Sequence, residues 1–164
     1  YDNNKKVHEA SMCVQIAEVE VDPVTGQVQL RKFTSSHSGG TVLNPLMHQG
    51  QIEGAAMTGI GYTLMEELPI ADGKVATANF GEYKIPNIQD TPLLKTTLVH
   101  SREGASPFQS KEIGESAISQ VAPAIANAIY DAVGVRIKDL PITAEKVYRA
   151  LKERRAENQR PSSK

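Results

Sequence analysis

The sequence has very little of several residue types, and each shortage excludes a class of site. Cys13 is the only cysteine in 164 residues, so there can be no internal disulfide and no local thiolate cluster for zinc or iron–sulfur. There is no tryptophan, and aromatic residues make up only 5%, which argues against a stacking platform for nucleic-acid bases. The formal net charge of −1 gives no field to attract nucleic acid or anionic lipid.

Long apolar segments are also missing. The longest apolar run falls far short of the roughly 20 residues that a membrane-spanning helix needs, and residues 1–4 are too polar to resemble a secretory signal. Together with the single cysteine, this predicts a reducing, cytoplasmic environment. The histidines lack metal-ligand spacing, so we expect them to be polar or hydrogen-bonded residues and assign no metal ligand: they are His8, His37, His48 and His100.

What the sequence does contain is typical of one globular domain of mixed α/β (α+β) class. Hydrophobic residues make up 40% of the chain, enough for a core. Residues 11–36 alternate apolar and polar side chains around a turn at 22–26, which predicts a β-hairpin with Gly26 in the turn. Residues 93–101 predict another strand, with antiparallel or mixed pairing. No linker divides the chain, so we treat residues 1–164 as one domain with a flexible tail from about residue 157.

A long glycine-rich helix is predicted from about Pro45 to Glu67, because apolar residues recur there at helical spacing after Asn44. Each interior glycine costs roughly 0.5–1 kcal/mol relative to alanine. Close packing against another backbone or a ligand would explain them, and a short, broken helix is the alternative. The glycines concerned are Gly50, Gly54, Gly59 and Gly61.

Two C-terminal helices are expected to complete the fold. The first covers about residues 122–134, with Pro123 in its first turn and Gly134 just past its end. The second follows Thr143 as its N-cap residue. The basic residues 152–155 near its end are interrupted by an acid, so we interpret them as a solvated helix end and not as a nucleic-acid patch.

The stretch SPFQSKEIGES, residues 106–116, places the carboxylate of Glu115 between Gly114 and an expected helix start. A helix N-terminus and Lys111 would both favour the charged carboxylate, whereas a dry pocket would raise its pKa and make it a stronger base. The alternative is an ordinary first-turn acid beside a Ser116 cap. Spacing alone leaves both interpretations open.

Several ordered motifs together resemble the molybdenum hydroxylases, the group of xanthine dehydrogenase, aldehyde oxidoreductase and nicotinate dehydrogenase. They are GGTVLNPLMHQGQIEGAAMTGIGYTLMEE, FGEYKIPNIQDTPLL and SPFQSKEIGES followed by PAIANAIYDAVG. The resemblance covers nearly the whole chain and falls in the C-terminal portion of the molybdopterin-binding large subunit. It implies that residues 1–164 form part of a molybdopterin-binding domain.

The resemblance also implies roles for individual residues. In the family's Lys-Gly-x-Gly-Glu motif the glutamate is the active-site base, and Glu115 stands at that position. Lys111, Ile113 and Gly114 belong to the same motif and are expected near the cofactor, as is Gln51, which matches a Gly-Gln motif. No residue of this chain is expected to bind the metal directly.

The implied activity is hydroxylation of an aldehyde or N-heterocycle with water-derived oxygen, using molybdenum held by molybdopterin or a dinucleotide form of it. The base would take a proton from a metal-bound hydroxide. Electrons would leave through [2Fe–2S] and FAD carried by partner chains, and the rest of the molybdopterin-binding chain would be a further partner. Alone, this chain is expected to be inactive.

The loop before Glu115 departs from the family pattern. Where the family has glycine, glycine, alanine and glycine, this chain has Ser106, Gln109, Ser110 and Glu112. Glu112 is expected either to crowd the cofactor or to change the pKa of Glu115 through its like charge. These differences keep a second hypothesis open, in which the chain is a non-catalytic structural paralogue within such a complex.

Overall fold

The computed structural model describes residues 10–102 and 104–159 and contains a three-stranded sheet with order β1-β2-β5. Strands β1 (Met12–Val21) and β2 (Val28–Ser38) form the predicted antiparallel hairpin, with Gly26 at φ +76° in its turn. Strand β5 (Leu93–Val99) pairs with β2 in parallel. The sheet is therefore mixed, and the predicted α/β class is confirmed.

Helix α1 (Pro45–Leu64) lies between β2 and β5 in the chain. It begins where predicted, because the Asn44 side chain accepts a hydrogen bond from the Met47 backbone N–H at 3.1 Å. It ends before the predicted Glu67, with Met65 as its C-cap residue. Parallel pairing of β2 and β5 requires a crossover connection, and a helix such as α1 is its usual form.

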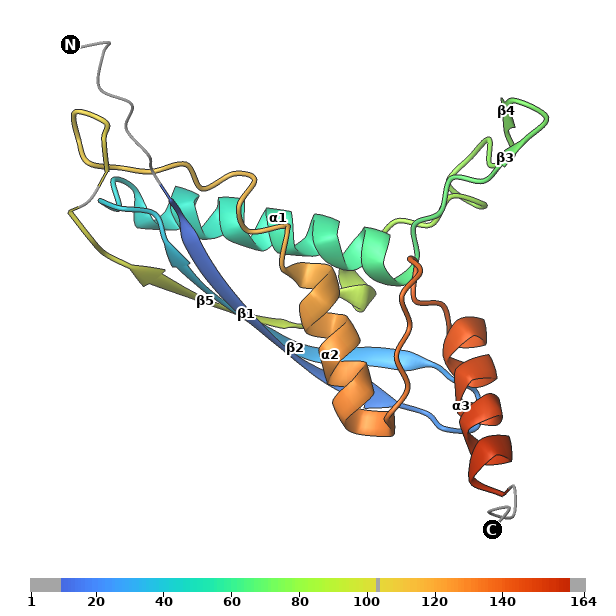
Figure 1. Ribbon diagram of the computed structural model, residues 1–164. Coiled ribbons are helices and arrows are strands. Elements are labelled where there is room, and N and C mark those ends of the chain that lie inside the picture. Colours follow the sequence, from blue (N-terminus) through green and yellow to red (C-terminus); the bar gives the residue numbers. More distant parts are fainter. Residues whose placement is uncertain (1–9, 103, 160–164) are drawn as a thin grey trace.

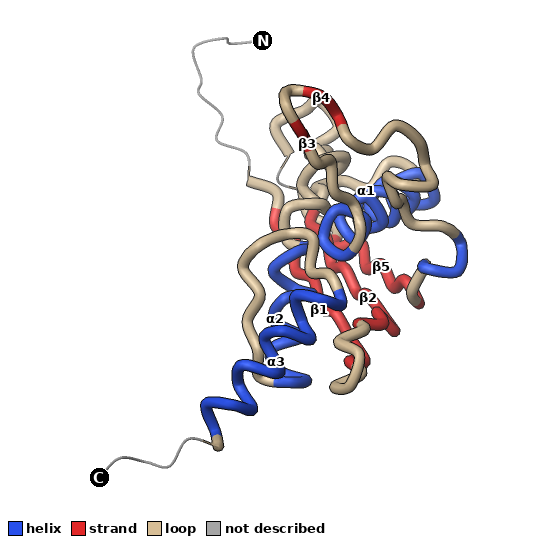
Figure 2. Tube along the Cα trace, turned by 90° about the vertical axis from the view of Figure 1, so that its right-hand side faces the viewer, coloured by secondary structure: helices blue, strands red, loops and turns tan. Residues whose placement is uncertain are grey.

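Helices α1 and α2 (Val121–Val133) pack on one face of the sheet, and α3 (Ala144–Asn158) lies by the β1–β2 turn (Figures 1 and 2). Both α2 and α3 fall where predicted: Gly134 ends α2 at φ +67°, and Thr143 caps α3. Their buried residues join β2 and α1 in one core: Leu30, Phe33, Ala56, Ile60, Val121, Ile125, Ile129, Val135, Ile142, Val147 and Leu151.

The segment between α1 and β5 forms an arm that projects away from the sheet (Figure 1). It contains β3 (Ile70–Ala71) paired with β4 (Lys74–Val75) around a turn at Asp72 and Gly73, and a short 3₁₀ helix, Ile88–Asp90. Exposed apolar side chains such as Phe80 and Ile88 lie along it. The face of the sheet that is not covered by α1 and α2 also exposes apolar residues of β1, among them Met12 and Val14.

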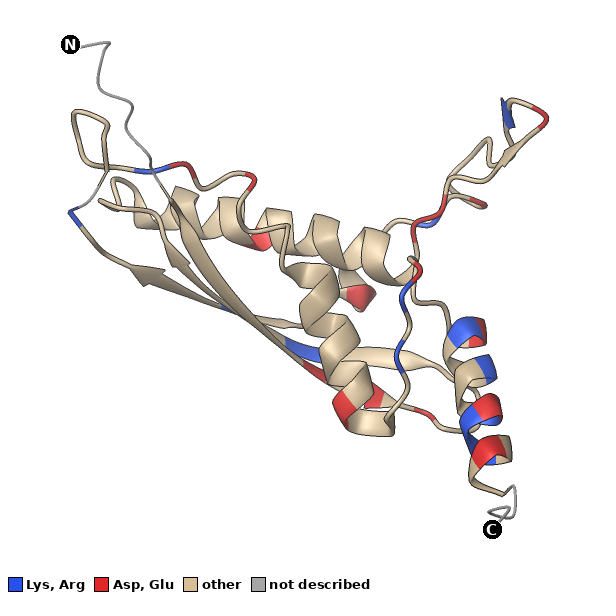
Figure 3. Cartoon of the chain, in the orientation of Figure 1, with Lys and Arg blue, Asp and Glu red and all other residues tan. Residues whose placement is uncertain are grey.

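Charge is distributed unevenly between the helices. Helix α3 carries acids and bases along its length, whereas in α1, which is described throughout, Glu53 is the only residue among Asp, Glu, Lys and Arg (Figure 3). Within the described ranges, none of the helices is both long and apolar enough to cross a membrane. Helix α3 continues through Asn158, and the last residues of the expected flexible tail lie outside the described ranges.

Candidate active site

A surface depression of about 480 Å³ brings together Gln51 and Glu115, which are far apart in the sequence. One wall is the middle of α1, residues 50–58, and the other is the segment just before α2. Its lining residues are Gly50, Gln51, Gly54, Ala55, Thr58, Gly114, Glu115 and Ile118. The fold therefore places two of the residues expected near the cofactor, Gln51 and Gly114, beside the expected base.

Bare backbone makes up much of this depression. A Cβ atom built on Gly50 or Gly54 would meet nothing within 4 Å. A Cβ atom on Gly114 would lie 3.8 Å from Oε1 of Gln51, an ordinary contact distance. Three glycines thus leave room for a group to approach the chain closely, with an amide and a carboxylate at the edge. The Gln51 amide, the Glu115 carboxylate and the open glycine surface fit an extended polar cofactor.

The carboxylate of Glu115 is exposed and faces this depression. The described residues offer it no hydrogen bond, whereas its backbone N–H donates to Oε1 of Glu112 at 2.6 Å. Its carbonyl accepts a hydrogen bond from the N–H of Ile118 at 3.1 Å. The backbone of Glu115 is thus held from both sides while its carboxylate stays available.

The expected position of Glu115 at a helix mouth is wrong. Residues 114–120 form a series of turns, and α2 begins only at Val121 with Gln120 as its N-cap residue. Ser116 does not cap the helix, because its hydroxyl bonds to His37 instead. Neither the helix dipole nor a serine cap therefore accounts for Glu115, and the capped-helix alternative fails in the form in which the sequence suggested it.

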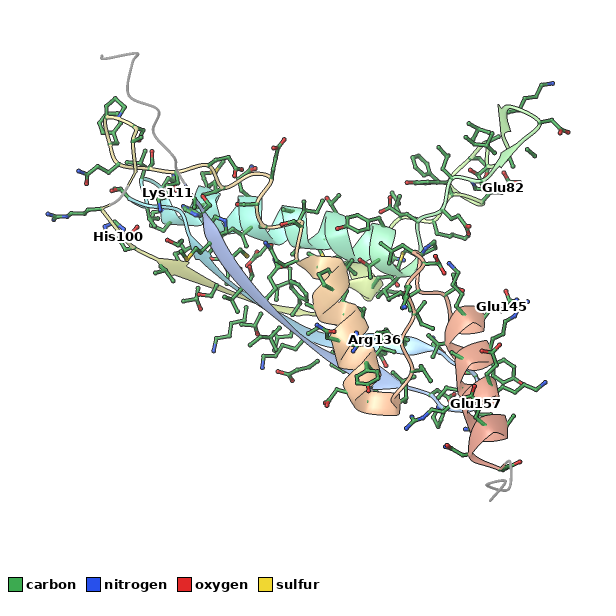
Figure 4. All side chains as sticks on the ribbon, viewed as in Figure 1. Glu82, His100, Lys111, Arg136, Glu145 and Glu157 are labelled. Carbon is green, nitrogen blue, oxygen red and sulfur yellow. The ribbon has the colours of Figure 1, made fainter. Side chains whose placement is uncertain are left out.

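Lys111 and Ile113 lie along a second hollow, next to the first. Its lining includes Gln51, which faces both, and residues at the end of β2 and the start of α1. Lys111 lies beside the N-terminal end of α1 (Figure 4), and its ammonium donates to the carbonyl of Ala10 at 3.0 Å. The expected site residues thus line two adjoining hollows along α1.

We call residues 106–115 the base loop. Its residues that depart from the family pattern have local structural roles. The Ser106 and Ser110 hydroxyls lie 3.0 Å apart, and the Ser110 N–H donates to Oγ of Ser106 at 2.9 Å, which closes a small ring around Gln109. Gln109 has φ +59°, a conformation that favours glycine. Glu112, expected to crowd the cofactor or alter the pKa of Glu115, accepts the Glu115 backbone N–H.

Sequence reasoning missed a buried histidine pair beneath this loop. His37 and His48 are 0% and 5% exposed, and their rings meet edge to face with centroids 5.9 Å apart. Burial lowers the pKa of both rings, and proximity to His48 lowers the pKa of His37 further while the Glu112 carboxylate acts in the opposite direction. The neutral form of each imidazole is therefore favoured. His37 alternates inward with Phe33 and Ser35 on β2, which is the signal that could have placed it on the inner face of the sheet.

Among the other expected residues, His100 accepts a hydrogen bond from the Val42 N–H through Nδ1 at 3.3 Å, and His8 lies outside the described residues. Cys13 is partly buried, with Sγ 3.5 Å from Oγ of Ser35. In the described part of the chain, His, Cys, Asp and Glu form no group of three or more that could hold a metal.

Comparisons with known proteins identify the family to which this fold belongs. The model of the molybdopterin cofactor-binding domain family matches residues 1–92. The chain belongs to this family, and its relatives are of the molybdenum hydroxylase type.

Two relatives illustrate the similarity. A probable xanthine dehydrogenase subunit of Bacillus subtilis (strain 168) is 39% identical over 134 residues, which cover 82% of this chain and 18% of that protein. An aldehyde oxidoreductase molybdenum-binding subunit of Escherichia coli (strain K12) is 33% identical over 147 residues, covering 88% and 20%. The chain thus spans about a fifth of the length of these relatives.

Solved structures show the same similarity. The aldehyde oxidoreductase of Desulfovibrio gigas superposes with a TM-score of 0.80 at 35% identity, covering 87% of this chain and 15% of that one. The quinoline 2-oxidoreductase of Pseudomonas putida 86 gives 0.77 at 32% identity, covering 82% and 18%. The expected resemblance to molybdenum hydroxylases is confirmed at the level of family and fold.

Proposed function

We propose that this chain supplies the general base of a molybdenum hydroxylase, with Glu115 as that base. The observation that carries the proposal is the shared depression of Gln51, Gly114 and Glu115, where an available carboxylate faces a bare glycine surface. The enzyme would hydroxylate an aldehyde or N-heterocycle with water-derived oxygen, which agrees with the names of the relatives.

Each residue that lines the depression would have a separate role in the proposed reaction. The molybdenum cofactor, bound as molybdopterin or a dinucleotide form, would supply the metal that acidifies water and accepts electrons. Gly50, Gly54 and Gly114 leave space beside it, and the Gln51 amide can donate to it or accept from it. The carboxylate of Glu115 takes up the proton at its own oxygen, while Glu112 holds its backbone in place.

The remaining components belong to other sequence. We propose that the rest of the molybdopterin-binding chain covers the apolar arm and the open face of the sheet, and that [2Fe–2S] and FAD partners carry electrons away. On this proposal the chain is inactive alone and works in the cytoplasm. The word subunit in the name of the Bacillus relative supports a multi-chain assembly.

The base is tested by Glu115→Gln in the assembled enzyme. Glutamine keeps the size of the side chain but cannot take up the proton, so turnover should fall by roughly 10²–10⁴. Molybdenum content and thermal stability should equal those of the parent. Glu112→Gln is the matched control, because its amide oxygen can still accept the Glu115 N–H, and it should change turnover little.

The second hypothesis is a structural paralogue without catalysis, and the substituted loop 106–112 favours it. It predicts that the purified complex lacks molybdenum, or that it contains molybdenum and turns over equally with Glu115→Gln. Metal analysis of the intact complex, alongside assays of the two variants, separates the hypotheses.

A further inference from the structure

The loop that carries Glu115 is attached to the end of strand β2 at several successive points. Gly40 and Ser110 form a β-bridge, and the Lys111 N–H donates to the Gly39 carbonyl at 2.8 Å. A Cβ atom on Gly39 would lie 2.8 Å from Cγ2 of Ile113. The backbone just after β2 therefore supports the loop at Ser110 and Lys111 and packs against Ile113, before the proposed base.

After Glu115, the attachment to β2 is made by a side chain. Nε2 of His37 lies 2.6 Å from Oγ of Ser116, a hydrogen bond between groups 79 residues apart whose donor depends on the ring's tautomer. Ser116 directly follows Glu115 in the sequence. Fixing Ser116 therefore limits where the backbone of Glu115 can sit, and with it the origin of its carboxylate.

The histidine ring is itself held rigidly. His37 is fully buried on the inner face of the sheet, and its edge-to-face neighbour His48 comes from α1. Gly39 lacks a Cβ that would lie 2.5 Å from Cε1 of His48, so the second ring can fill the space under Ile113. Strand β2 and helix α1 thus fix one imidazole, and that imidazole holds Ser116.

A histidine side chain is energetically unfavourable at this buried position if its only role is packing. Nδ1 of His37 and Nε2 of His48 are buried with no hydrogen-bond partner among the described residues. An unsatisfied buried polar atom is destabilising, so an apolar side chain would pack more favourably if packing were the only role. The one specific interaction that His37 makes with the described part of the loop is its hydrogen bond to Ser116.

We propose that His37 is a positioning residue for the proposed base, acting through Ser116 to set the place of Glu115 in the depression. This inference rests on the proposed function, since Glu115 must be the base for its position to matter to turnover. The groups that face His37 are His48 from α1, Glu112 and Ser116 from the loop, and Cys13 opposite it on β1. Of these four, Ser116 is the one whose side chain hydrogen-bonds to the ring.

The test compares His37→Phe, His37→Gln and Ser116→Ala in the full enzyme. Phenylalanine keeps a ring but loses the hydrogen bond, whereas glutamine places an amide group near the position of Nε2. His37→Phe and Ser116→Ala should each lower kcat by about tenfold to a hundredfold, because small misplacements of a reacting group cost rates of this size. KM should change little, and His37→Gln should recover much of kcat.

Hydrogen–deuterium exchange of the backbone in the same proteins gives a readout independent of turnover. Exchange in residues 112–118 should become faster in His37→Phe and Ser116→Ala, but not in helix α3. Thr63→Val is the matched control, because it removes a buried hydroxyl that donates to the Gly59 carbonyl of its own helix. It should leave exchange in the loop and kcat unchanged.

Unchanged exchange and unchanged kcat in both Ser116→Ala and His37→Phe would overturn the positioning role. So would an equal loss of kcat in His37→Gln and His37→Phe that follows a loss of molybdenum or of stability, because that pattern describes packing alone. If exchange accelerates but Glu115→Gln keeps full activity, His37 positions the loop and the proposed function is what fails.

Discussion

The two halves of helix α1 use glycine in opposite ways. In the C-terminal half, a Cβ on Gly59 would lie 2.6 Å from Cγ2 of Val121, so this glycine allows α1 and α2 to pack closely. In the N-terminal half, Gly50 and Gly54 face open space beside Gln51 and Glu115. The same residue type in one helix therefore serves the core at one end and the candidate site at the other.

This contrast shows why the glycine content of α1 had two explanations at the level of sequence. Close packing is the explanation for Gly59, and room for a ligand is our explanation for Gly50 and Gly54. The short, broken helix is excluded, because α1 runs unbroken through Leu64. Substitutions at the two ends should therefore have different consequences.

The largest effect on stability is expected from Gly59→Ala. The new methyl group would overlap Val121, and overpacking of a core typically costs about 1–3 kcal/mol. The free energy of unfolding of the enzyme should fall by that amount in denaturant titrations, without a specific loss of molybdenum from the folded protein. A variant as stable as the parent would show that α1 and α2 do not meet closely here.

The next effect, on the candidate site and not on stability, is expected from Gly54→Leu. Leucine favours the helix and has open space around it, so stability should equal or exceed that of the parent. The side chain would fill the depression, and turnover or molybdenum content should fall at least about tenfold, equivalent to about 1.4 kcal/mol. A stable variant that binds metal and turns over normally would separate the depression from the cofactor.

The smallest effect is expected from Gln109→Gly in the base loop. Gln109 has φ +59°, where glycine avoids the steric cost of a side chain but loses more entropy on folding. We expect a gain in stability of up to about 1 kcal/mol, measured as a higher unfolding midpoint. A loss of stability would mean that the Gln109 side chain makes a contribution larger than its backbone strain.

Much of the fold could be predicted because its signals are local. Alternation with period two indicated the hairpin, Asn44 and Thr143 marked two helix starts, and Gly134 marked a helix end. The start of α2 was also placed correctly, by Pro123 in its first turn. The parallel pairing of β2 with β5 could not be read this way, since it depends on how α1 crosses the sheet.

The candidate site was predictable only in part. The resemblance singled out Glu115 and Gln51, and the structure brings them to one depression, but their roles stay a proposal. The helix-mouth explanation for Glu115 failed because turns at 114–120 separate it from α2. The hydrogen bond between His37 and Ser116 joins distant parts of the chain, so no spacing within the sequence could indicate it.

The reductive half-reaction of the assembled enzyme tests the central proposal most directly. Mixing metal-loaded parent and Glu115→Gln proteins with substrate, without an electron acceptor, measures the rate of cofactor reduction apart from all later electron transfer. At equal molybdenum content, the account predicts a rate at least about a hundredfold lower for Glu115→Gln, the lower bound for loss of a general base. Equal rates in the two proteins would contradict it.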